Sequence, residues 1–187
     1  MMDVQTFDTI QAKQITLVDE DGKGKVGLGI VKGVGGLGLF DATGNLRIVL
    51  AFSEEASGLT FTDATGKIRC VLGMNGDNPT MTLADKDGKS RFILCIMDDK
   101  PSLSLADKAG KVRAFMGFEK EEPYLSLNDE TGIMRVWLGL QEAGPGLYLS
   151  DAAGKWRARL YVTKDGLPEM VLTDAEGKPI TCLPEGT

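Results

Sequence analysis

A 22-residue repeat constrains the fold of this chain more than any other feature of its sequence. Each unit contains a glycine with an aspartate three residues before it, and successive glycines lie 22 residues apart six times and 23 residues apart once. These glycines are Gly22, Gly44, Gly66, Gly88, Gly110, Gly132, Gly154 and Gly177. A unit this short buries its apolar side only against its neighbours. The sequence therefore predicts a single repeat domain over residues 15–183. Residues 1–14 form a leader or an oligomerisation segment outside it, and residues 184–187 form a tail.

One unit illustrates how the others are built. The stretch 101–107 alternates apolar and polar residues, which is the period of a half-buried strand. Asp107 and Gly110 favour a tight turn, because an aspartate carboxylate accepts local N–H groups and glycine tolerates positive φ. The stretch 112–118 then returns with a second alternation, which places Val112 on the apolar side. The equivalent turn residues are Asp63, Gly66, Asp85, Gly88, Asp129 and Gly132. This pattern predicts an all-β chain of about sixteen short strands.

Side chains alternate between the two faces of a strand, and this alternation, which we call parity, indicates how consecutive strands pair. A four-residue loop over 107–110 sets Leu105 opposite Val112, and the next loop sets Met116 opposite Leu125. Both hairpins then collect their apolar residues on one face. A three-residue loop with a bulge sets Leu105 opposite Arg113 and mixes the faces, so parity disfavours it. The prediction is an antiparallel meander with one apolar face and one polar face.

The predicted polar face combines hydroxyl and guanidinium groups. Its expected members are Thr60, Thr82, Ser104, Ser126, Arg47, Arg69, Arg91, Arg113, Arg135 and Arg157. Parity also places Trp137 on this face and Trp156 toward the core. Arginines recognise sulfate or carboxylate groups, and a sugar ring stacks on an exposed tryptophan. The possible ligand surface therefore comprises Arg69, Arg91, Arg113, Arg135 and Trp137, although a solubilising role explains the arginines more simply.

A parallel β-solenoid with one unit per coil obeys the same parity and is the alternative fold. It stacks equivalent residues at ~4.8 Å, so its aspartates and arginines form like-charge ladders. The meander separates them about twofold further, and electrostatics favours it. An open meander leaves its apolar face uncovered, so the sequence also predicts a homo-oligomer. The simplest such assembly is a symmetric prism of three sheets, a homotrimer.

Composition limits the classes of function. The net charge of -6 argues against nucleic acid as the main partner. The absence of histidine removes the commonest general base and most transition-metal sites. The cysteines Cys70, Cys95 and Cys182 are odd in number and unpatterned, so they predict no disulfide framework. No apolar run reaches the ~20 residues that span a membrane. We expect no catalytic residues, no cofactor, no metal and no membrane insertion by this chain.

Three segments resemble known functional motifs. The segment Gly33–Gly38 matches a dinucleotide-binding pattern, but a strand rather than a helix is expected after it, so we interpret it as a glycine-rich loop. Asp19–Gly22 suggests a calcium loop but lacks the glutamate that an EF-hand needs at Ile30. The pairs Glu54–Glu55, Asp98–Asp99 and Glu121–Glu122 offer carboxylates for metals or for acid/base work. Because all three occupy the same loop of their units, we interpret them as a solvated acidic edge.

The repeat resembles sequences of known type. The pattern Leu-x-Leu-x-Asp-x-x-Gly-Lys-x-Arg, found here over residues 103–113, is similar to tandem repeats of uncharacterised bacterial proteins. It also loosely resembles shaft segments of trimeric phage tail fibres and surface adhesins, and less closely the Tyr-Asp repeats of bacterial shells, since the Tyr-Asp pair is missing. The resemblance implies a non-enzymatic structural or interaction module in an extracellular, cell-surface or phage-particle setting, with a glycan or cell-surface ligand as a possible partner. The alternative is a carbohydrate- or ion-binding module using the Arg, Ser, Thr and Trp137 face.

Overall fold

The computed structural model describes residues 5–31 and 33–183, and its contacts divide the chain into two compact units, Met1–Asp77 and Asn78–Thr187. Unit 1 contains β1 (Gln14–Val18), β2 (Gly24–Val31), β3 (Val34–Phe40), β4 (Leu46–Phe52), β5 (Ala56–Thr62) and β6 (Ile68–Asn75). Unit 2 contains β7 (Asn78–Ala84), β8 (Ser90–Met97), β9 (Lys100–Ala106), β10 (Val112–Glu119), β11 (Glu122–Asn128), β12 (Met134–Gly139), β13 (Gly146–Ser150), β14 (Trp156–Val162), β15 (Pro168–Thr173) and β16 (Pro179–Leu183).

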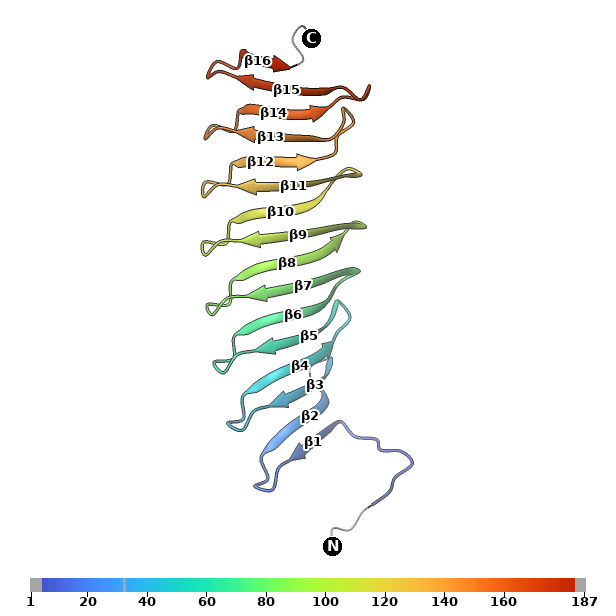
Figure 1. Cartoon of the computed structure of the whole chain (residues 1–187). Coiled ribbons are helices and arrows are strands. Elements are labelled where there is room, and N and C mark those ends of the chain that lie inside the picture. Colours follow the sequence, from blue (N-terminus) through green and yellow to red (C-terminus); the bar gives the residue numbers. More distant parts are fainter. Residues whose placement is uncertain (1–4, 32, 184–187) are drawn as a thin grey trace. The chain divides into compact units, whose positions relative to one another are not determined.

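Within each unit, every strand pairs with the next strand in the sequence, and each of these pairs is antiparallel (Figure 1). No helix occurs among residues 5–31 and 33–183. The predicted all-β meander is therefore confirmed. The parallel solenoid is wrong, because its strands would pair in parallel with equivalent residues one coil away.

The repeated turn has the geometry that its sequence predicts. In the unit around Asp107, the N–H of Gly110 donates to the Asp107 carbonyl at 2.8 Å, and the N–H of Asp107 donates to the Lys111 carbonyl at 2.9 Å. The Asp107 carboxylate accepts two further backbone N–H groups, from Ala109 at 2.8 Å and from Lys111 at 3.1 Å. Gly110 has a φ of 86°, which any residue with a Cβ adopts only under strain. The carboxylate thus satisfies backbone donors that the tight turn leaves unpaired.

The register across this turn differs from the prediction. Leu105 lies opposite Ala114, and a bulge between Val112 and Ala114 inserts Arg113 as an unpaired residue. The turn itself shifts the pairing by one residue and the bulge shifts it by another, so the total shift of two restores the side-chain parity. The predicted pairing of Leu105 with Val112 is therefore wrong, whereas the faces assigned to Leu105 and Ala114 are right. Across the other loop, Met116 lies opposite Leu125, as predicted.

The bulge also changes the face of the residue before it. Trp156 occupies the place equivalent to Val112, ahead of the bulge in β14, and its ring contacts that of Tyr148. The expectation that Trp156 faces the apolar core is therefore wrong, because parity counted without a bulge assigns it to the wrong side.

A row of aliphatic side chains runs across the middle of the strands on one face of each unit, and we call this the leucine face. In unit 1 the paired residues of this row are Ile15, Leu28, Leu37, Leu50, Leu59 and Leu72. In unit 2 they are Met81, Leu94, Leu103, Met116, Leu125, Leu138, Leu147, Leu160, Met170 and Leu183. Cross-strand partners point to the same side of a sheet, so each row is continuous.

The opposite face of the sheet is mixed rather than polar. In unit 2 its middle row reads Thr82, Ile93, Ser104, Phe115, Ser126, Trp137, Tyr148, Arg159, Val171 and Cys182. The predicted hydroxyl groups lie on this face, but large apolar and aromatic side chains separate them. The expectation of a uniformly polar face is therefore wrong in unit 2, because β8, β10 and β12 contribute Ile93, Phe115 and Trp137 to this row.

Gly110→Val should destabilise the protein by on the order of 1–3 kcal/mol, because the turn requires a φ of 86° that a β-branched residue tolerates poorly. The space around Gly110 is open, so the backbone strain is the whole cost. Lys108→Ala in the same turn should be nearly neutral. Denaturant unfolding of the two variants measures the difference, and equal midpoints would show that the turn imposes no conformational demand.

Candidate functional site

The predicted ligand arginines bind the turns of their own repeats. Arg113 donates from Nη1 to the Asp107 carboxylate at 3.3 Å and from Nε to the Asn128 carbonyl at 2.8 Å. Arg135 repeats both bonds, to Asp129 at 3.3 Å and to the Ser150 carbonyl at 3.0 Å. Each guanidinium therefore connects a turn to the end of the following strand, which explains why a bulge places it there.

The other two arginines of the predicted surface form the same ion pair. Arg69 lies 3.4 Å from Asp63, and Arg91 lies 2.5 Å from Asp85. Their side chains are 37% and 25% exposed, so these pairs are partly screened by solvent. This geometry gives the arginines a structural role in the turn, and binding of a sulfated or carboxylated ligand to them stays a prediction.

The turn aspartates are held in their ionised form. Hydrogen bonds lower the pKa of Asp129 to about 2, and the Thr131 hydroxyl has the largest effect. The backbone N–H groups of Ile133 and Thr131 and the Arg135 guanidinium lower the pKa as well, whereas desolvation of the carboxylate raises it. The equivalent contacts, led by the Thr65 hydroxyl, lower the pKa of Asp63 to about 2. Hydrogen bonds that favour the carboxylate over the carboxylic acid have this effect.

Acid should weaken the turns within a defined window. A carboxyl group with a folded-state pKa of about 2 and an ordinary value of 3.8 contributes stability that is complete above about pH 4 and is lost as the pH falls through about 2. Thr131→Ala should raise the pKa of Asp129 toward 3.8 and leave that of Asp63 at about 2. Carbon-detected NMR titration of the carboxyl groups measures both values in one sample. An unchanged Asp129 pKa would contradict the role of the hydroxyl.

The paired carboxylates lie in the hairpin loops opposite the Asp–Gly turns, except Glu122, which is the first residue of β11. Asp98 and Asp99 both have positive φ, 49° and 61°, as a two-residue hairpin loop between paired Met97 and Lys100 requires. Within the described part of the chain, no cluster of three or more His, Cys, Asp or Glu residues suits a metal ion.

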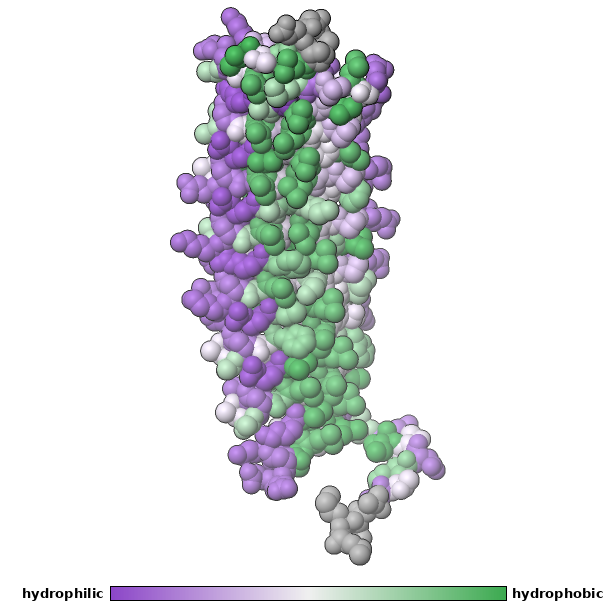
Figure 2. Space-filling view, viewed as in Figure 1, coloured by the Kyte–Doolittle hydropathy of each residue, from purple (hydrophilic) through white to green (hydrophobic). Residues whose placement is uncertain are grey.

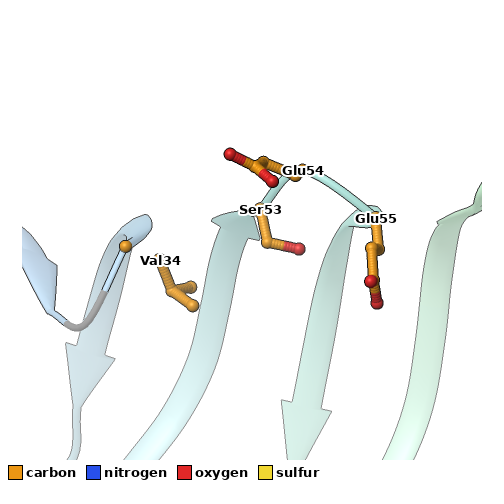
Figure 3. Close-up of a pocket in the computed structure, with 5 residues that line it drawn as sticks. Val34, Ser53, Glu54 and Glu55 are labelled. Carbon is orange, nitrogen blue, oxygen red and sulfur yellow. The ribbon is translucent and has the colours of Figure 1, made fainter.

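One such loop borders the pocket in Figure 3, a 360 Å³ hollow in unit 1 lined by Gly33, Val34, Ser53, Glu54 and Glu55. The carboxylates of Glu54 and Glu55 point away from each other in this view, so they do not converge on a common ligand. The glycine motif is divided between a loop and a strand: Gly33 lies in the hairpin loop, and Gly35 to Gly38 belong to β3. The interpretation of this segment as a loop is therefore right for Gly33 and wrong for Gly35 to Gly38, which form a strand rather than the helix start of a pyrophosphate site.

The leucine face is exposed to solvent in both units. Leu50 and Leu72 of unit 1 are 53% and 54% exposed, and Met116 and Leu160 of unit 2 are 58% and 53% exposed. No charged residue lies in the paired strand positions of this face among the described residues. Figure 2 shows hydrophobic side chains gathered over the strands and hydrophilic ones along the edge of the Asp–Gly turns. Apolar exposure on this scale is typical of an interaction surface.

A hollow of 310 Å³ lies on the leucine face of unit 2. It is lined by residues of β8 to β11, including Leu94, Leu103, Met116, Phe118 and Pro123. All of these side chains are apolar, so the hollow suits another apolar side chain better than a polar ligand.

The opposite face of unit 2 carries an aromatic cluster that the other repeats lack. The ring centroids of Tyr124 and Trp137 are 6.4 Å apart, those of Trp137 and Tyr148 are 5.1 Å apart, and those of Tyr148 and Trp156 are 5.6 Å apart. These four residues border a pocket of 220 Å³, which we call the aromatic pocket, together with Glu119, Met134 and Gln141. Burial raises the pKa of the Tyr124 phenol, and the Glu119 carboxylate raises it further, which places that charge within electrostatic reach of the ring.

Trp137 lies on the predicted face but is not exposed. Only 6% of its surface is accessible, because its ring lies against Gly139, where an added Cβ would be 2.9 Å from the indole. The expectation that Trp137 is exposed is therefore wrong, and sugar binding at this face stays a prediction. Gly139, two residues after Trp137, was the sequence feature that could have predicted this burial. A glycine has no side chain, so the indole ring can lie over it along the same strand.

Comparison with protein-family models and with curated proteins finds no match for this chain. Among residues 5–31 and 33–183, no helix is long and apolar enough to cross a membrane.

Proposed function

We propose that this chain is a non-enzymatic structural and interaction module, and that copies of it assemble through the leucine face. The observation that supports this most strongly is a continuous aliphatic row without charged neighbours on the same face, in which every second member is about half exposed. Full burial of a leucine side chain contributes about 1.5–3 kcal/mol, and roughly half of this remains to be gained at each half-exposed leucine, so an uncovered row is unfavourable.

The area of the face matches what a stable assembly requires. The ten strands of unit 2, at ~4.8 Å spacing and ~20 Å length, give a face of about 900 Å². A standard interface buries about 800 Å² on each partner. A second copy is the favoured occupant, because a row of side chains that repeats every second strand packs best against a surface with the same spacing.

A homotrimer satisfies the geometry of the side chains. Three sheets about 20 Å wide, arranged as a triangular prism, place each sheet about 6 Å from the axis, which is close to half of the ~10 Å between packed sheets. Leucine and methionine side chains fill that distance, whereas four sheets would leave a void. Two sheets packed face to face are the competing arrangement.

The second candidate, a carbohydrate- or ion-binding module using the Arg, Ser, Thr and Trp137 face, has less support. The arginines are bonded to their own turns, and Trp137 is buried. The shaft and adhesin setting rests on the resemblance of the repeat alone.

Thermal unfolding at two protein concentrations a hundredfold apart tests the proposal. Assembly coupled to folding raises the midpoint at the higher concentration by mass action. A midpoint that does not change with concentration would contradict assembly through the leucine face.

A further inference from the structure

The aromatic pocket lies where the repeat departs from its own pattern. The sequence contains two tryptophans and three tyrosines, and all five lie between residues 124 and 161, in β11 to β14. The strands outside this segment form the same hairpins without any tryptophan or tyrosine, so the fold does not require them. A departure confined to four adjacent strands indicates a local role beyond stability.

The rings surround the pocket from different directions. The planes of Trp137 and Tyr148 are 81° apart, and those of Tyr148 and Trp156 are 65° apart, whereas Tyr124 and Trp137 are nearly parallel at 16°. Trp137 is the least exposed of the described residues that line the pocket. Trp156 also lines the pocket and is 37% exposed. Rings arranged at steep angles enclose a rounded group better than they stack on a flat one.

The charge around the pocket favours a cation. Among the described residues that line it, Glu119 is the only charged one, and none is a lysine or an arginine. The adjoining hollow of 190 Å³ shares Glu119 and adds Glu122 and Lys120. The faces of aromatic rings are electron-rich, and together with a carboxylate they attract a positive group and repel a negative one.

We propose that the aromatic pocket binds a methylated ammonium group, such as a choline headgroup or a trimethylated lysine side chain. A volume of 220 Å³ is below the roughly 300 Å³ at which pockets for drug-sized ligands begin, so one compact group fits it. A cation without N–H donors suits these walls, because the ring faces offer attraction without hydrogen-bond partners. Arg159 lies opposite Tyr148 on the same face but does not line the pocket, which leaves the site free for a ligand cation.

This inference does not depend on assembly, because the pocket and the leucine face are on opposite sides of unit 2. An experiment can therefore contradict cation binding by the aromatic pocket without contradicting assembly through the leucine face, and the reverse is also true. The molar mass of each variant, measured in the same samples, reports on assembly alone.

Tryptophan fluorescence of the full chain provides the test, since both tryptophans line the pocket. Titration with choline and with trimethyl-lysine covers the two sources of the group, and 3,3-dimethylbutanol provides a neutral ligand of the same shape as choline. We expect at least one cation to bind with a Kd about tenfold or more below that of the neutral alcohol.

Two pairs of variants connect binding to the pocket. Glu119→Gln should weaken cation binding several-fold, whereas Glu121→Gln should not, because Glu121 belongs to the same hairpin but does not line the pocket. Trp156→Ala should weaken binding about tenfold, and Trp156→Phe should retain most of it by keeping a ring. The thermal midpoint of each variant reports whether the fold is retained.

Three results would overturn the proposal. Equal binding of choline and its neutral analogue would make the pocket an apolar site, and binding of a neutral monosaccharide in place of the cations would make it a sugar site. A parent protein that binds neither cation up to about 10 mM would leave only a structural aromatic cluster.

Discussion

Leu94→Asp should convert the assembled protein into single chains. Leu94 is 43% exposed in the single chain and lies in the middle row of the leucine face, so in the proposed trimer it becomes buried between copies. The substitution removes about 1.5–3 kcal/mol of apolar burial per copy and adds an unpaired carboxylate at a cost of several kcal/mol. Three copies incur this cost together in a trimer. Sedimentation should show the mass of one chain, and the thermal midpoint should fall.

Leu94→Met is the matched control for this substitution. Met116 occupies the equivalent place in the next repeat, so the leucine face already accommodates a methionine in this row. The cost of such a volume-conserving exchange is below about 1.5 kcal/mol, and the assembly should persist. If the Leu94→Asp chain kept the mass and the midpoint of the parent protein, the leucine face would not be the contact surface.

Gly73→Ala should destabilise unit 1 by about 3 kcal/mol, because the added methyl group meets backbone atoms. A Cβ on Gly73 would lie 2.2 Å from the Ser57 carbonyl oxygen and 2.7 Å from the Cα of Gly58, on the neighbouring strand β5. Neither atom moves without shifting the paired strands. Denaturant unfolding of the full chain measures the loss.

Gly58→Ala provides the comparison on the other side of the same pair. Its added Cβ would lie 3.0 Å from the Leu72 carbonyl oxygen and 3.2 Å from the Cα of Gly73, so a small adjustment relieves the contact and the cost should be about 1 kcal/mol. A Gly73→Ala protein as stable as the Gly58→Ala protein would mean that the strands separate more easily than this geometry allows.

The apolar face follows from the sequence because it depends on the alternation of side chains alone. The antiparallel strand order needed a second argument, because a parallel solenoid has the same alternation but stacks like charges. A period of two, with Leu103, Leu105, Ala114 and Met116 at fixed places, assigns these residues to one face whether the register is shifted by zero or by two. The repeated Asp and Gly likewise specify the turn, since few other residues combine a local acceptor with positive φ.

The bulge at each arginine could not be predicted from the alternation of apolar and polar residues, because a register shift of two residues leaves that alternation unchanged. Its signal was the constant six-residue separation of Asp107 and Arg113, which a straight hairpin does not explain and an ion pair across the turn does. The same bulge moves Trp156 to the side of Tyr148.

The aromatic pocket depends on contacts between neighbouring repeats that the pattern within one repeat does not encode. Trp137 packs between Tyr124 and Tyr148, which are 13 residues before it and 11 residues after it, and the angles between their planes arise only after the strands have paired. Glu119, the last residue of β10, and Gln141, in the loop after β12, complete the site from two different hairpins.

Molar mass measured by light scattering on the parent protein tests the central claim most directly. Assembly through the leucine face predicts a mass three times that of one chain, falling toward that of one chain on dilution. A mass of two chains would retain the leucine face as the contact and replace the prism by two facing sheets. A mass of one chain at every concentration would contradict the account.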